Sequence, residues 1–107
     1  MANRATKLAT FTTTATGDGQ VFAMLRDQSG VLVVEYDGTL GTFTVIIEGR
    51  AVPGTGGWAL ITQKTQADVN ATNMATAAAV TLMPEMRARC TVYTGGSQTA
   101  VRAYIVQ

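Results

Sequence analysis

Short segments rich in threonine and β-branched residues recur along the chain, and turns rich in glycine and aspartate separate them. Residues of this kind favour pleated, half-buried strands. With turns spaced about 8 to 12 residues apart, the sequence predicts about seven to eight short strands and no convincing helix. The predicted fold class is all-β: a single antiparallel β-sandwich, jelly-roll or Ig-like, with a small closed barrel as the alternative.

The alternation of apolar and polar residues predicts which face of a strand enters the core. In residues 42–48, Phe43, Val45 and Ile47 share one face, and we expect that face to be buried. In residues 85–94, the alternation sets Arg87, Arg89 and Tyr93 against Met86, Ala88, Cys90 and Val92. The single cysteine is therefore predicted to be a buried thiol and not a nucleophile, which would need a nearby base.

Two hairpins are predicted from the turn residues. Val31–Tyr36 and residues 42–47 flank an Asp-Gly pair, which is typical of a hairpin turn. Residues 85–94 and 99–106 flank a Gly-Gly pair and are predicted to form the second hairpin. Residues 65–79 admit a helical turn or two, but their threonines and valines favour a strand or an irregular connection.

The chain has 107 residues, the common size of one domain. Residues 8–107 are predicted to form the single β-sandwich domain. Residues 1–7 are polar, carry Arg4 and Lys7, and are predicted to be a flexible N-terminal arm that either orders on a partner or stays frayed. No apolar run approaches the ~18 to 20 residues of a membrane span or the apolar core of a signal peptide, so we expect a soluble product made in the cytoplasm.

Composition limits the chemistry that the chain can perform. It has no histidine, which excludes the commonest general base and the commonest zinc ligand. Eight Lys plus Arg against seven Asp plus Glu give a net charge of +1, so nothing indicates nucleic acid or a membrane as partner. Only 14% of the residues are charged, so electrostatic repulsion does little to prevent self-association. We expect a protein that is not an enzyme, uses no cofactor or metal, and contacts other protein.

Two places in the sequence are candidates for binding. Arg87, Arg89 and Tyr93 are predicted to share a strand face that either grips an acidic patch or a sugar, or is an ordinary solvated face. Trp58, which follows a glycine pair, either offers a platform for carbohydrate stacking or packs over the mouth of the sandwich.

The order of these features resembles the small β-sandwich virion proteins of tailed bacteriophages. The resemblance rests on the strand Gly41–Gly49, on Gly57–Leu60 with its tryptophan, and on Met86–Gly96, which leads into the last strand. It covers the chain from about Thr14 to its end and consists of strand and turn patterns, without a diagnostic site.

The resemblance implies a structural role with no catalytic residues. Such proteins include capsid decoration (cement) proteins, which bind the outer surface of a phage head and stabilise it through multivalent contacts. The implied partners are the major capsid protein and copies of this chain, possibly as a trimer, and the implied location is the virion. The alternative is a fibre, tail or collar module that binds host-surface glycans. The residues expected to contact a partner are Arg4, Lys7, Trp58, Arg87, Arg89 and Tyr93.

Overall fold

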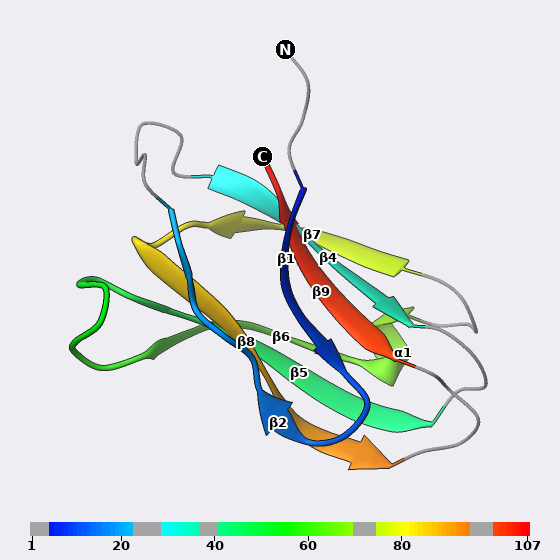
Figure 1. Ribbon diagram of the computed structural model, residues 1–107. Helices are drawn as coiled ribbons and strands as arrows, with labels where there is room; N and C mark the ends of the chain where they lie inside the picture. The colour runs from blue at the N-terminus through cyan, green and yellow to red at the C-terminus, as the bar shows by residue number, and fades with distance from the viewer. Residues whose placement is uncertain (1–4, 23–28, 37–40, 70–74, 95–99) are drawn as a thin grey trace.

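A computed structural model describes residues 5–22, 29–36, 41–69, 75–94 and 100–107. Two antiparallel sheets pack face to face (Figure 1), which confirms the predicted all-β sandwich. One sheet has the order β1-β9-β4-β7, and the other has the order β2-β8-β5-β6, with β3 also paired to β8. The strands are β1 (Ala5–Phe11), β2 (Ala15–Thr16), β3 (Gln20–Val21), β4 (Ser29–Tyr36), β5 (Thr42–Arg50), β6 (Ala59–Thr65), β7 (Ala75–Thr81), β8 (Glu85–Thr94) and β9 (Val101–Val106).

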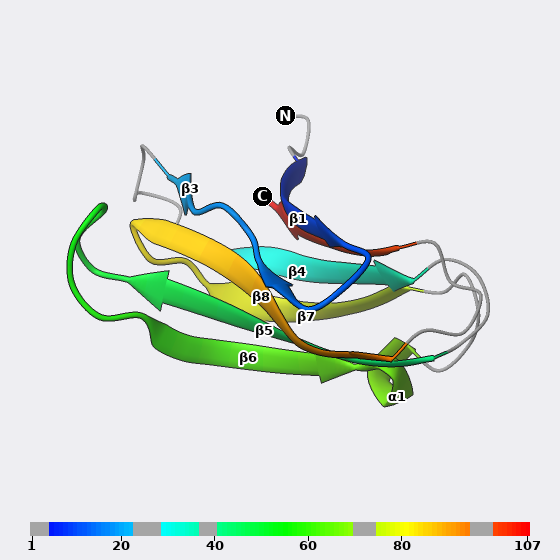
Figure 2. The same ribbon diagram turned by 60° about the horizontal axis from the view of Figure 1, so that its bottom comes forward.

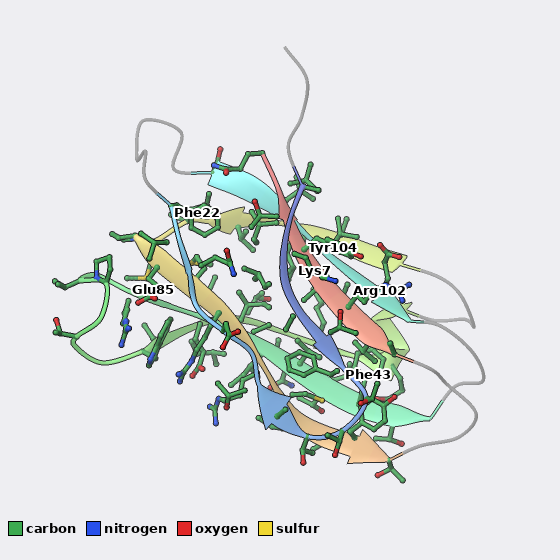
Figure 3. The ribbon with its side chains drawn as sticks, in the orientation of Figure 1. Lys7, Phe22, Phe43, Glu85, Arg102 and Tyr104 are labelled. Atoms are coloured by element: carbon green, nitrogen blue, oxygen red, sulfur yellow. The ribbon has the colours of Figure 1, made fainter. Side chains whose placement is uncertain are left out.

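The core lies between the two sheets and is made of the inward faces of their strands. As predicted, Phe43, Val45 and Ile47 of β5 are fully buried, and Phe43 points into the space between the sheets (Figure 3). Cys90 is also buried, as predicted, and desolvation raises the pKa of its thiol. The buried cluster is completed by Leu8, Phe11, Phe22, Leu32, Val34, Val80, Leu82, Met86, Ala88, Val101, Ala103 and Ile105.

One short helix, α1 (Gln66–Val69), joins β6 to β7 at one end of the sandwich (Figure 2). The Phe43 N–H donates a hydrogen bond of 3.1 Å to Gln66 Oε1, which ties the helix to the start of β5. The ambiguous segment 65–79 thus contains one helical turn and most of β7, with residues 70–74 outside the described part. Within the described ranges, no helix is long and apolar enough to cross a membrane.

Neither predicted hairpin forms, because in both cases the chain changes sheet. β4 pairs with β7 and β9, whereas β5 pairs with β6 and β8. Likewise β8 belongs to one sheet and β9 to the other. The hairpin signal is strongest when two residues separate the strands. Here residues 37–41 and 95–100 separate them, and a segment of this length can span the ~10 Å between packed sheets.

The first strand begins before the predicted domain boundary at Leu8. Residues 5–7 pair with β9, and Lys7 lies opposite Tyr104. The predicted arm therefore overlaps a paired strand at these three positions, which composition could not reveal because the pairing is made by the backbone. Residues 1–4 of the predicted arm lie outside the described residues.

A close backbone approach requires a glycine immediately after β2, where the chain still runs beside β8. The Gly17 N–H donates a hydrogen bond of 2.9 Å to Ala88 O, and a Cβ at Gly17 would lie 2.6 Å from the Ala9 Cβ. Alanine at position 17 should lower the unfolding free energy by about 1–3 kcal/mol. Its Cβ would collide with the Ala9 Cβ, and neither atom can move away without a shift of the backbone. Gly57→Ala is the control, since a Cβ there meets nothing within 4 Å. Urea denaturation of both variants checks this, and equal stabilities would contradict it.

Candidate functional site

Charged side chains gather on the outer face of the β2-β8-β5-β6 sheet. Because Met86, Ala88 and Cys90 point into the core, the alternate residues of β8 point outwards. The antiparallel register places Glu48 opposite Arg87, and Arg50 opposite Glu85. Opposite charges therefore face each other across β5 and β8, an arrangement that stabilises a sheet pair.

Glu48 is the centre of the first ion-pair group. Its Oε1 accepts hydrogen bonds from Arg87 Nε at 3.0 Å and from Arg89 Nε at 3.1 Å, and its Oε2 accepts one from Arg89 Nη2 at 3.2 Å. The Glu48 side chain is only 9% exposed. A carboxylate so poorly hydrated needs charged partners, and the two guanidinium groups supply them.

Glu85 is the centre of the second group and connects the sheet to the loop after β5. Its Oε1 accepts hydrogen bonds from Arg50 Nε at 2.5 Å and from the Gly54 N–H at 3.2 Å. Gly54 has a φ of 81°, and the Thr55 N–H donates to Val52 O at 3.2 Å. Pro53 followed by a glycine with positive φ is the sequence of a type II turn, so this turn presents the Gly54 N–H to the carboxylate.

The pKa of Glu85 is lowered, first by the hydrogen bond from Arg50 and then by that from the Gly54 N–H. Because the pKa is lowered only in the folded state, the Glu85 carboxylate of the unfolded chain takes up its proton at a higher pH than that of the folded chain. This contribution to stability is full above the ordinary carboxyl value of 4.5 and is lost as the pH falls through the lowered value. Chemical denaturation across this acid range should show a smaller loss of stability for Glu85→Gln than for the parent. An identical pH dependence in both proteins would contradict the assignment.

Trp58 connects the two ion-pair groups. The guanidinium carbon of Arg87 lies 4.0 Å from the centroid of its ring, and that of Arg50 lies 4.4 Å away. Both distances are within the range of a cation–π interaction. Each arginine is thus held at once by a carboxylate and by the aromatic ring, which restricts the side-chain freedom of all three residues.

Exposed apolar side chains surround this cluster. Leu60 of β6 is 63% exposed and lies opposite Glu48, and Val21 of β3 is 60% exposed and lies opposite Glu85. Val52, in the loop after β5, is 57% exposed. We call the whole surface the Trp58 face; its members are Val21, Glu48, Arg50, Val52, Trp58, Leu60, Glu85, Arg87 and Arg89.

Of the predicted contact residues, the structure brings together Trp58, Arg87 and Arg89. The predicted strand face shared by Tyr93 with Arg87 and Arg89 is wrong, because Tyr93 is partly buried against the core while Val92 is 41% exposed. The cause is a register shift, since Thr44 pairs with Val92 but Val45 pairs with Cys90, which reverses the faces of β8 beyond that point.

Of the two remaining predicted residues, the structure places only Lys7, which does not belong to the Trp58 face. Lys7 lies near Tyr104 and Arg102 on the other sheet, apart from Glu85 (Figure 3). Arg4 lies outside the described residues. Glu48, Arg50 and Glu85 were not predicted. Their signal was the charge at every second position of residues 48–50 and 85–89, but its meaning depends on the pairing of β5 with β8.

No protein-family model, no curated protein and no solved structure matches this chain. In the part of the chain that the structure describes, no group of three or more Asp, Glu or Cys side chains could hold a metal ion.

Proposed function

We propose that this chain is a structural virion protein of the decoration type, which binds the outer surface of a phage head with its Trp58 face and acts by binding alone. The observation that carries the binding role is the tryptophan held by two arginines within 4.4 Å of its ring, next to exposed Leu60 and Val21. Tryptophan and arginine are, with tyrosine, the residues enriched at energetically dominant positions of protein interfaces.

The ion pairs make this face suitable for tight contact. Glu48 and Glu85 hold the three arginines in place before a partner arrives, so little side-chain freedom remains to be lost on binding. The Arg89 side chain is the most open of the three, at 39% exposure, and can donate to a carboxylate or carbonyl of the partner. The preferred partner surface is thus apolar with acceptor groups at its margin.

The phage assignment is supported by the strand and turn patterns that resemble small virion sandwiches, and the low charge of the chain fits repeated attachment to a protein lattice. Under this proposal the major capsid protein is the partner and the virion surface is the location. The alternative, a fibre or collar module that binds glycans, is less favoured because the Trp58 ring already stacks against two guanidinium groups, which compete with a sugar for its surface.

Binding to phage heads that lack the protein tests this proposal. The Trp58→Ala variant should bind at least tenfold more weakly than the parent, and Leu60→Ser should weaken binding without loss of stability because its side chain is mostly exposed. Tyr104→Ala is the matched control, an aromatic residue on β9 in the other sheet. Failure of the parent to bind heads would overturn the virion role, whereas weakening by Tyr104→Ala alone would overturn the choice of face. Binding to a glycan array would favour the alternative.

A further inference from the structure

The edges of the two sheets differ in how they are protected against pairing with another chain. An edge strand exposes unpaired N–H and C=O groups, and natural proteins protect such edges with charged residues, proline, bulges, very short strands or a covering helix or loop. Here the edges are β1 and β7 in one sheet, and β6 opposite β2 and β3 in the other.

Three of these edges carry protection. β1 has the exposed Lys7 and a register shift between Lys7 and Ala9. β6 carries Lys64, and its pairing with β5 shifts between Ile47 and Glu48. β2 and β3 have two residues each, too few to act as a template for a strand.

β7 carries no charge, proline or bulge along its length. It has seven residues, Ala75–Thr81, without a charge or a proline. All seven pair with β4 without a register shift, so the strand has no bulge that would turn its edge away. The described side chains on its outer face, Ala77, Ala79 and Thr81, are small and exposed. Among the described residues, no strand pairs with the other side of β7.

We propose that β7 pairs with β7 of a second copy of this chain, antiparallel about a two-fold axis, so that two four-stranded sheets become one continuous sheet. The strand is self-complementary: in a register centred on Ala78, Ala77 of one copy lies opposite Ala79 of the other. No like charges meet, because the strand has none, and the small side chains allow the usual strand spacing of about 4.8 Å.

The expected dimer is weak in dilute solution. Pairing along one seven-residue edge buries less surface than the ~1,200 Å² that a stable interface needs. The contact gains strength when copies are held close together, because the second contact then forms at a high effective concentration. It does not depend on the proposed phage role, since it is a property of the free chain.

Charge substitutions on β7 test the pairing. The variants Ala77→Lys/Ala79→Lys and Ala77→Glu/Ala79→Glu place like charges opposite each other in the proposed register, while both side chains stay on the exposed face. In sedimentation equilibrium over a concentration series, each should raise the dissociation constant at least tenfold. An equimolar mixture of the two should associate again, because lysine then faces glutamate. Thr10→Lys on β1 is the control and should associate like the parent.

Circular dichroism verifies that both variants fold, and hydrogen exchange supplies a second measurement. In the parent, amide exchange in residues 75–81 should slow as the concentration rises, and in the lysine variant it should not. A parent that remains monomeric at its highest soluble concentration would overturn the proposal, as would two charge variants that associate like the parent. Failure of the parent to bind phage heads while it still self-associates through β7 would overturn only the functional proposal and leave the β7 pairing intact.

Discussion

Replacement of Phe43 by alanine should lower the free energy of unfolding by about 3–5 kcal/mol, the largest effect expected of any core substitution described here. Phe43 is fully buried between the two sheets, so the change removes apolar contacts and leaves a cavity that strands on both sides cannot close. Urea denaturation followed by tryptophan fluorescence measures the change through the single tryptophan.

Val52→Ala is the control for this prediction. Its side chain is largely exposed, so the loss should stay within about 0.5 kcal/mol. If Phe43→Ala cost no more than Val52→Ala, Phe43 could not occupy the centre of the sandwich, and the packing of the two sheets would have to be revised.

Replacement of Glu48 by alanine should have the second largest effect, a loss of about 2–3 kcal/mol. The change leaves Arg87 and Arg89 without their shared carboxylate on a partly buried surface. Breaking a fully buried ion pair costs about 3–5 kcal/mol, and the loss is smaller for Glu48 because the Arg89 side chain is 39% exposed and can be hydrated. The same denaturation measurement applies.

The Glu35–Arg102 pair on the other sheet is a matched control, with its atoms 3.3 Å apart and the Glu35 side chain 39% exposed. Glu35→Ala should therefore cost at most about 1 kcal/mol. Equal losses for the two substitutions would show that burial does not distinguish the pairs. Tryptophan fluorescence of the folded protein reports separately on the position of Arg87. In Glu48→Ala this fluorescence should change, because Arg87, which lies 4.0 Å from the Trp58 ring, loses its carboxylate partner.

The fold class could be predicted from the sequence because a strand buried on one face alternates in polarity. Phe43, Val45 and Ile47 show this directly. The strand pairing could not be predicted in this way. β4 and β5 each present an apolar face, and such strands can pair with each other as a hairpin or face each other from two packed sheets. The Asp-Gly pair indicates a turn, but the connection of residues 37–41 is compatible both with a hairpin and with a crossing to the facing sheet.

The candidate site was predictable only in part, for a related reason. The outward direction of Arg87 and Arg89 followed from alternation. The face of Tyr93 was predicted wrongly, because a bulge between Cys90 and Val92 reverses the two faces of β8. Glu48 is adjacent to both arginines only because β5 and β8 pair. The contact of the Trp58 ring with Arg50 and Arg87 likewise depends on tertiary structure.

Quantitative mass spectrometry of purified phage particles, combined with imaging of the particle surface, tests most directly whether this chain is a decoration protein. The proposal predicts many copies spread over the head, and cross-links to the major capsid protein from residues of the Trp58 face. A few copies confined to the tail or collar would contradict the decoration role and favour the glycan-binding module. Absence of the chain from the particles would contradict the virion role altogether.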